Sequence, residues 1–309
     1  MSQPGSRVLS GIAFASLLLI AVLMGANHVA ARVGFNHGLD VASAVVARSL
    51  VTASLLFVLI RFSAVSMRFD ARQRRFVPLV GLLIGIQSLC LYSAVARIPV
   101  ALALLAFNTY PLWTALADWL FYRRKPERAT LIAMPMILVG LALALDVFGA
   151  ASGLGAKAQW QQIGVGVAFA TVAAAMFGGA LVFTQHELSS LDPRVRTACT
   201  LALASVIALI AGSVNLFGSV HGGFGLPNST TGWIGLALLT LLYGTGFTLM
   251  FTVLPKLGVA GNSAIMNVEP VFALTLAWLF LQQAIAPIQV VGALIVVATV
   301  VALGLRRGK

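Results

Sequence analysis

The sequence predicts an all-α, polytopic membrane protein whose ten transmembrane helices form an inverted five-plus-five repeat with both termini in the cytoplasm. Three observations lead to this fold class. The 309 residues are 60% hydrophobic and 9% charged, whereas about a quarter of the residues in a soluble domain are charged. The apolar residues gather in ten stretches, each close to the roughly 20 residues that cross a bilayer core. The basic residues between these stretches lie mainly on one side.

The first half contains five of the apolar stretches, and charged residues or Gly, Pro and Asn clusters bound them. The first begins after Arg7, the second ends before Arg61, and the fifth begins after Arg128. Several contain Gly or Pro, which helices in lipid tolerate better than soluble helices do. The predicted spans are Val8–Asn27, Val41–Ile60, Phe76–Ala96, Pro99–Phe121 and Ala129–Val147.

The second half contains five more stretches with the same kind of boundaries. The seventh follows Arg196, the ninth follows Lys256, and the tenth ends before Arg306. Ten spans use about 200 residues, which leaves too few for a sizeable soluble domain. We therefore divide the chain into two five-helix halves, residues 1–150 and 151–309. The predicted spans are Gln162–Phe183, Thr197–Leu216, Trp233–Val253, Val259–Phe280 and Pro287–Leu305.

The net charge of +12 indicates an orientation in the membrane. With the N-terminus inside, 16 of the 20 Lys and Arg lie on the inner side, and Arg32, Arg97 and Lys157 lie outside. Excess Lys and Arg in short cytoplasmic loops is the positive-inside rule. The basic charge thus predicts an even number of spans with cytoplasmic termini, and we expect no nucleic-acid partner.

The motifs of common enzymes are missing from the sequence. It contains no P-loop and no Gly-x-Ser-x-Gly turn, and His186-Glu187 is not followed by the second His of a zinc protease. Cys90 and Cys199 lie inside predicted spans, where cysteine behaves as a small apolar residue. We therefore expect no enzymatic activity, no cofactor and no metal site.

An internal repeat relates the two halves at an offset of 159 residues. At this offset Asn108 aligns with Asn267, and Pro111 aligns with Pro270. The Trp119-Leu-Phe segment likewise aligns with Trp278-Leu-Phe. Because five spans separate the copies, the second copy enters the membrane from the opposite side. The repeat is therefore predicted to be inverted, an arrangement common among secondary transporters.

Several segments also resemble a known family. They are Asn27–Arg32 at the end of the first span, Arg48 in the second, Tyr92–Ala96 before the fourth, and the Asn-x-x-Pro turns of the fourth and ninth. With them the chain resembles a ten-helix, EamA-type member of the drug/metabolite transporter superfamily, similar to exporters of amino acids. The family usually has a Gly-Glu pair where this chain has Arg123-Arg124 and Gln282-Gln283. No role for those glutamates is carried over.

The candidate substrate site lies around the two repeated prolines. Pro111 and Pro270 interrupt the helix hydrogen bonds at matching depths, and paired broken helices in inverted repeats indicate a midplane binding site. Asn108 and Asn267 either satisfy the freed carbonyl groups or offer an amide to the substrate. Glu269 is costly in mid-span unless it is paired or hydrated. It either binds a substrate ammonium or a proton, or it is a structural partner of Arg48 or of a neighbouring helix.

Aromatic and other polar side chains complete this candidate site. Tyr110 and Trp113 share one helical face with Phe107, and Tyr243 lies on an aromatic face of the eighth span. If the two faces meet, they form a flat-sided pocket for apolar or aromatic groups. The alternative is ordinary helix packing or lipid contact. Two polar residues of the third span, Gln87 and Tyr92, are further candidates to line a pathway.

Four charged or titratable residues are candidates for coupling or gating. Arg48 lies about 12 Å below the outer boundary, where it either receives a substrate carboxylate, pairs with an acid or extends to the surface. His28 is of the residue type that titrates near neutrality. Asp118 and Glu187 lie near inner helix ends, beside Arg123, Arg124 and Arg194. Ion pairs at a cytoplasmic gate are the preferred interpretation, and a solvated rim is the alternative.

These features together predict a secondary transporter in a bacterial inner membrane, working as a monomer or a homodimer. Resemblance to the family implies export of small organic metabolites, above all amino acids, and the aromatic faces favour large apolar or aromatic ones. The partners would be that substrate and the lipid bilayer. The alternatives are efflux of cationic drugs, transport of nucleotide-linked or lipid-linked sugars, and a membrane scaffold without transport.

Overall fold

The regular elements of the chain are helices throughout the part that the structure describes. The computed structural model describes residues 11–63, 65, 67–126, 128–149, 152–216, 223–252, 268–283 and 286–307. The helices in these ranges are α1 (Gly11–Asn36), α2 (Val41–Phe62), α3 (Ala71–Arg97), α4 (Val100–Phe107), α5 (Tyr110–Tyr122), α6 (Arg128–Ala144), α7 (Ala156–Glu187), α8 (Pro193–Ser213), α9 (Thr230–Thr252), α10 (Glu269–Leu281) and α11 (Pro287–Arg307).

The number of apolar segments agrees with the predicted spans. Seven helical segments of the described residues are long and apolar enough to cross a membrane, and α4 and α5 together form one of them. Three shorter apolar helices, at Leu131–Ala144, Glu269–Leu281 and Pro287–Ala302, bring the described candidates to ten. The predicted all-helical, multi-pass fold is confirmed. Which end faces the cytoplasm stays a prediction.

Some helices extend beyond the predicted spans. The prediction ended a span at a charged residue, but charged residues also lie within the helices. α1 continues to Asn36, so Arg32 is part of a helix and not of an outer loop. The Arg32 guanidinium donates hydrogen bonds to the carbonyl oxygens of Val95, at 2.6 Å, and Ile98, at 3.1 Å. Long arginine side chains lie along apolar surface while their head groups reach polar partners, so a charge does not mark the end of a span.

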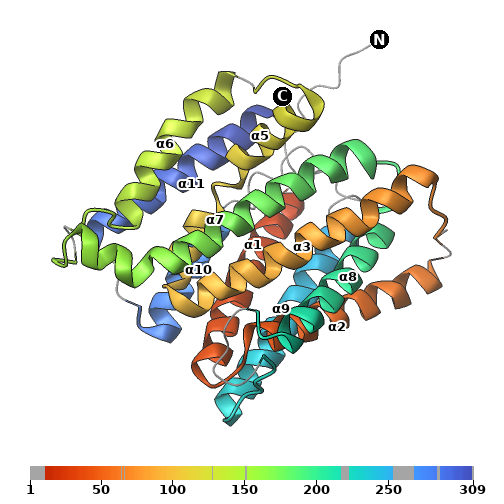
Figure 1. The fold of residues 1–309 in the computed structure, drawn as a ribbon, viewed down its shortest axis with the longest axis horizontal. Coiled ribbons are helices and arrows are strands. Elements are labelled where there is room, and N and C mark those ends of the chain that lie inside the picture. The colour runs from red at the N-terminus through yellow and green to blue at the C-terminus, as the bar shows by residue number, and fades with distance from the viewer. Residues whose placement is uncertain are drawn as a thin grey trace.

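The two halves are interleaved, and their packing follows the repeat (Figure 1). The repeat relates α3 to α9 and α7 to α1. α3 lies along α7, and their counterparts α9 and α1 likewise lie along each other. α2 packs on its counterpart α8, and α6 packs on its counterpart α11, which forms one edge of the molecule in Figure 1. Exchange of the halves thus reproduces the main helix contacts.

Backbone conformations repeat at the offset found in the sequence. Thr109 precedes α5 with φ −72° and ψ −6°, and Val268 precedes α10 with φ −80° and ψ −2°. The same two helices end in left-handed residues, Arg123 at φ 56° and Gln282 at φ 51°. This conformation after a helix favours glycine. Here arginine and glutamine adopt it instead.

Two glycines allow the crossings that the repeat shares. A β-carbon on Gly25 of α1 would lie 3.0 Å from the amide nitrogen of Ala273 in α10. A β-carbon on Gly178 of α7 would lie 2.7 Å from the amide nitrogen of Thr114 in α5. Thr114 and Ala273 are again 159 residues apart. The first helix of each half therefore packs through a glycine directly on the backbone of a helix from the other half. Gly25 of α1 packs on α10, and Gly178 of α7 packs on α5.

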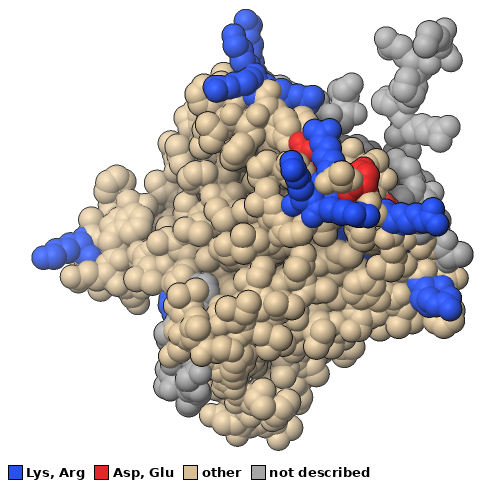
Figure 2. Space-filling model, turned by 45° about the vertical axis from the view of Figure 1, so that its right-hand side comes forward, with Lys and Arg blue, Asp and Glu red and all other residues tan. Residues whose placement is uncertain are grey.

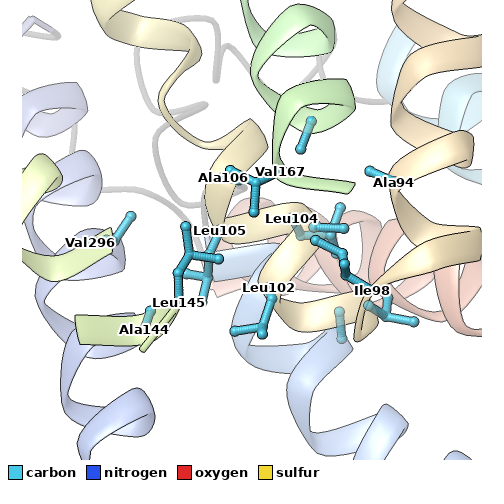
Figure 3. Close-up of a cluster of buried hydrophobic side chains, with 14 of the residues drawn as sticks. Ala94, Ile98, Leu102, Leu104, Leu105, Ala106, Ala144, Leu145, Val167 and Val296 are labelled. Atoms are coloured by element: carbon cyan, nitrogen blue, oxygen red, sulfur yellow. The ribbon is translucent and has the colours of Figure 1, made fainter. Parts of the chain in front are cut away.

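The largest buried apolar cluster lies where α4 meets its neighbours (Figure 3). Its side chains come from both halves, including Ile98, Leu104 and Leu145 of the first half and Val167 and Val296 of the second. Large apolar side chains also cover the outside of the helices, for example Ile132 and Leu241, as expected where lipid is the surrounding solvent. Figure 2 shows Lys and Arg gathered at the periphery of one face, with a broad uncharged area between them.

Candidate functional site

Polar and aromatic side chains from five helices meet inside the apolar bundle and form what we call the central cluster. α1, α2, α3, α9 and α10 each contribute at least one residue. The central cluster consists of Asn27, His28, Arg48, Tyr92, Tyr243 and Glu269. All but Glu269 are buried, and the side chain of Glu269 is 27% exposed. Five of these six residues were predicted to bind substrate or to take part in coupling.

Glu269 is placed at the first residue of α10. α10 begins at Glu269 with Pro270 in its first turn, where proline fits because the first amide groups of a helix have no partner within it. The carboxylate therefore lies at the positive end of the helix dipole, which stabilises it. Oε1 of Glu269 lies 3.3 Å from Nε2 of His28 on α1. A neighbouring helix thus supplies the partner, and Arg48 does not.

Arg48 is held between two tyrosine rings. Its guanidinium carbon lies 4.2 Å from the ring centre of Tyr92 and 4.1 Å from that of Tyr243. Cation–π contacts of this kind are stronger when the pair is removed from water, and Arg48 is 3% exposed. The Tyr92 hydroxyl donates a 2.8 Å hydrogen bond to Oδ1 of Asn27. The ring of Tyr92 also meets that of His28 edge-on at 5.7 Å.

Several polar atoms in this region have no partner. Among the described residues, the buried side-chain nitrogen and oxygen atoms without a hydrogen bond are Asn27 Nδ2, His28 Nδ1, Arg48 Nε, Ser49 Oγ and Ser93 Oγ. All five belong to α1, α2 or α3, and three belong to the central cluster. Buried polar groups in proteins are nearly always paired. A concentration of unpaired groups therefore indicates a place that a polar ligand or water completes.

At the break in the fourth span, between α4 and α5, a backbone carbonyl finds hydrogen-bond donors within the break itself. The carbonyl of Ala106 accepts hydrogen bonds from the amide and from the hydroxyl of Thr109. The Asn108 side chain is buried at this break, and Pro111 follows in the first turn of α5. The Ala106 carbonyl at the end of α4 is thus satisfied by Thr109, which the sequence analysis did not consider. The repeat counterpart of Asn108, Asn267, lies outside the described residues.

The predicted aromatic faces have separate partners. Tyr110 contacts Phe107 and Phe177, with ring centres 5.7 Å and 5.2 Å away, and Trp113 lies half-buried in the next turn. Tyr243 contacts Phe247, with ring centres 4.4 Å apart. The rings pack in two groups because α4 and α5 pack on α7, whereas α9 packs on α1 and α2. That the two faces line one pocket stays a prediction.

Two other predicted residues have different surroundings. Gln87 is buried in α3, where its Oε1 accepts a 3.4 Å hydrogen bond from Ser88. Pro270 lines a small apolar crevice between α4, α10 and α11, whose other walls include Leu105 and Leu294. The lining of this crevice carries no polar side chain that could orient a polar substrate.

A second polar group, which we call the inner network, ties α3, α5 and α7 together near their predicted cytoplasmic ends. The inner network consists of Arg72, Asp118, Tyr122, His186 and Glu187. Glu187 accepts hydrogen bonds from Nε of Arg72 and from the hydroxyl of Tyr122. His186 stacks on Tyr122 with ring centres 3.9 Å apart, and its Nε2 lies 2.9 Å from Oδ1 of Asp118.

The residues that pair with Asp118 and Glu187 in the inner network differ from those predicted for the cytoplasmic gate. The sequence analysis paired Asp118 and Glu187 with Arg123, Arg124 or Arg194. In the structure Arg194 pairs instead with Asp192, at 2.9 Å. This contact holds the pKa of the Asp192 carboxyl below its usual range, because the Arg194 side chain donates hydrogen bonds to it. Adjacent charges on a sequence are therefore a poor guide to pairs that form between helices.

Ten apolar segments, an interleaved repeat and a buried polar cluster define a multi-pass membrane protein of the transporter class. The EamA-like transporter family matches residues 9–145 and 164–305. Since these two stretches cover most of the chain, the protein belongs to this family.

Individual relatives are distant. An uncharacterized transporter of Synechocystis sp. is 25% identical over 222 residues, which is 70% of this chain and 62% of that protein. The alignment therefore spans less than two thirds of the relative. One crystal structure of a protein matches 93% of this chain and 96% of its own chain, with a TM-score of 0.60 and 16% identity. That likeness shows the shared fold alone.

Proposed function

We propose that the protein is a secondary transporter that exports amino acids, including large apolar and aromatic ones, across a bacterial inner membrane. Membership of the EamA-like family supports the transporter class. The observation that supports a small polar substrate is the central cluster, where a carboxylate, a guanidinium and unpaired hydrogen-bonding atoms lie inside an apolar bundle. Intramembrane ionisable residues commonly mark substrate pathways.

The two kinds of side chain have separate roles in this proposal. Glu269 binds the substrate ammonium, because it is the partly exposed carboxylate of the central cluster. Tyr110, Phe177 and Trp113 contact the substrate side chain, since aromatic rings provide flat apolar walls. Asn108 lies at the break before α5, and together with its repeat counterpart Asn267 it acts on the polar end of the substrate.

Alternating access follows from the interleaved halves. Inverted repeats commonly move substrate by rocking one bundle against another around a fixed midplane site. The inner network joins α3, α5 and α7 at the predicted cytoplasmic end. Exchange with the cytoplasm requires these contacts to break, so the inner network acts as the inner gate.

The test is transport by purified protein in liposomes, using a panel of amino acids, cationic drugs and nucleotide sugars. We expect flux of amino acids, with the highest rate for large apolar or aromatic ones. Trp113→Ala should lower the preference for aromatic over small substrates. Trp119→Ala is the matched control, since this tryptophan of the same helix is 45% exposed on the outside. Flux of none of the amino acids would refute the proposal.

The same panel separates the alternatives. Glu269 favours efflux of cationic drugs as the second candidate, because it is a carboxylate within the bundle. That function predicts flux of cations that carry no carboxylate, and no flux of amino acids. Transport of nucleotide sugars would instead make Arg48 the essential residue, while a scaffold would move no compound of the panel.

A further inference from the structure

We propose that Arg48 is the centre of a subsite that binds the carboxylate of the transported substrate. This inference rests on the proposed transport function and adds the anionic end of the substrate to it. Three features carry it: the charge balance of the central cluster, the way the guanidinium is held, and the donors beside it.

The charge of Arg48 has no counter-ion among the described residues. The carboxylates found there within 4.0 Å of a basic side chain contact other residues: Arg72 contacts Glu187, Arg194 contacts Asp192, and the imidazoles of His28 and His186 contact Glu269 and Asp118. Glu269, the acid of the central cluster, lies beside His28 and not within ion-pair distance of Arg48. A charged side chain inside a membrane protein costs several kcal/mol unless it is paired or hydrated. An anion brought by the substrate would supply the missing charge.

The two tyrosines decide how such an anion can approach. Because the rings of Tyr92 and Tyr243 both lie about 4 Å from the guanidinium carbon, the cation is covered by aromatic surface. Its N–H groups point outward in its own plane, which is the fork geometry that matches a carboxylate. Nε is buried and has no hydrogen-bond partner. The rings also hold the side chain in place, which reduces the entropy lost on binding.

A neutral donor accompanies the cation. Asn27 accepts the Tyr92 hydroxyl with Oδ1, so its Nδ2 is held at the edge of the ring that packs on Arg48. This Nδ2 is buried and unpaired. A carboxylate offers two oxygens with about four acceptor sites. Arg48 Nε and Asn27 Nδ2 together provide two of the donors that such an acceptor requires.

The substrate class then follows from the two ends of the site. Arg48 on α2 binds a carboxylate, and Glu269 on α10 binds an ammonium group. A compound that carries both groups is an amino acid, whereas an amine or a carboxylic acid uses one end only. The site should therefore prefer the zwitterion over analogues that lack either charge.

The experiment compares analogues that share one side chain. The dissociation constants of phenylalanine, phenylalaninamide, phenethylamine, 3-phenylpropionate and phenyl phosphate are measured with the purified full-length protein. We expect phenylalanine to bind about ten-fold or more tightly than phenylalaninamide, since hydrogen bonds to charged groups contribute most. Arg48→Gln should remove this preference and leave phenylalaninamide binding unchanged. Arg97→Gln is the control, because Arg97 is an exposed arginine of α3 that also packs on a ring.

The outcomes separate this inference from the proposed function. Equal binding of phenylalanine and its amide by the unmodified protein would overturn the carboxylate subsite without the need for any variant. A preference that survives in Arg48→Gln, or Arg48-dependent binding of phenyl phosphate alone, would overturn it as well. If 3-phenylpropionate binds through Arg48 while amino acids are neither bound nor transported, the subsite stands and the proposed function fails. If no carboxylate binds, the subsite is refuted.

Discussion

The central cluster and the inner network both join charged and aromatic side chains from several helices, but they differ in how completely their polar groups are paired. In the inner network both carboxylate oxygens of Glu187 accept a hydrogen bond, and Arg72 keeps 64% of its side chain exposed. In the central cluster Arg48 is buried without a counter-ion among the described residues, and three side chains have unpaired atoms. Complete pairing stabilises one conformation, whereas incomplete pairing leaves groups for a ligand.

The largest expected effect comes from a matched change of one glutamate in each region. Glu269→Gln should weaken amino-acid binding by about 100-fold, because a hydrogen bond between charged groups contributes up to about 3 kcal/mol. Glu187→Gln should change the affinity by less than about three-fold, since distant sites without shared partners act independently. The dissociation constants measure both. Equal losses in the two variants would erase the distinction between the regions.

The second prediction concerns opening of the inner end. Glu187→Gln removes the acceptor charge that joins Arg72 and Tyr122 to α7, so amide hydrogen exchange at the end of α7 should accelerate by roughly ten-fold. Glu269→Gln is the control and should leave exchange at this end unchanged. Unaltered exchange in Glu187→Gln would mean that the inner network does not hold the gate closed.

The third prediction compares two tyrosine hydroxyls that each donate to one acceptor. Tyr122→Phe removes a hydrogen bond to a carboxylate and should lower the free energy of unfolding by about 2 kcal/mol. Tyr92→Phe removes a hydrogen bond to a neutral amide and keeps the ring against Arg48, so a loss of about 1 kcal/mol is expected. Unfolding of the detergent-solubilised proteins measures the difference. A reversed order would contradict the stronger pairing of the inner network.

The smallest effect is local to the loop beside the inner network. Asp192 caps α8 by accepting a hydrogen bond from the amide of Arg194. Asp192→Ala should therefore cost about 1 kcal/mol of stability at neutral pH. Because the pKa of Asp192 is lowered in the folded protein, its contribution is complete above the ordinary value of 3.8 and is lost as the pH falls further. The difference between the two proteins should stay constant from about pH 7 to pH 5 and shrink below pH 3.8. A difference that shrinks already between pH 7 and pH 5 would contradict this assignment.

The sequence predicted much of the fold because hydrophobic length and a repeated motif are local signals. The described residues contain ten apolar candidates, as predicted, and the offset of 159 residues reappeared in the paired caps at Arg123 and Gln282. Helix ends were less accurate, since Arg32 lies within α1 and reaches carbonyl groups of α3. These carbonyl groups are more than 60 residues away in the chain, so no local pattern identifies them.

For the candidate site, the sequence identified residue types, and the tertiary structure decided their partners. His28, Arg48, Tyr92, Tyr243 and Glu269 attract attention on a sequence because polar residues are costly in apolar spans. Their arrangement depends on how α1, α2, α3, α9 and α10 pack. This packing brings Glu269 next to His28 and places Arg48 against the rings of Tyr92 and Tyr243. Arg72, Tyr122 and His186 were missed as members of the inner network because solvated loops and helix ends carry many such residues. Burial cost is a property of each residue, but pairing is a property of the packed bundle.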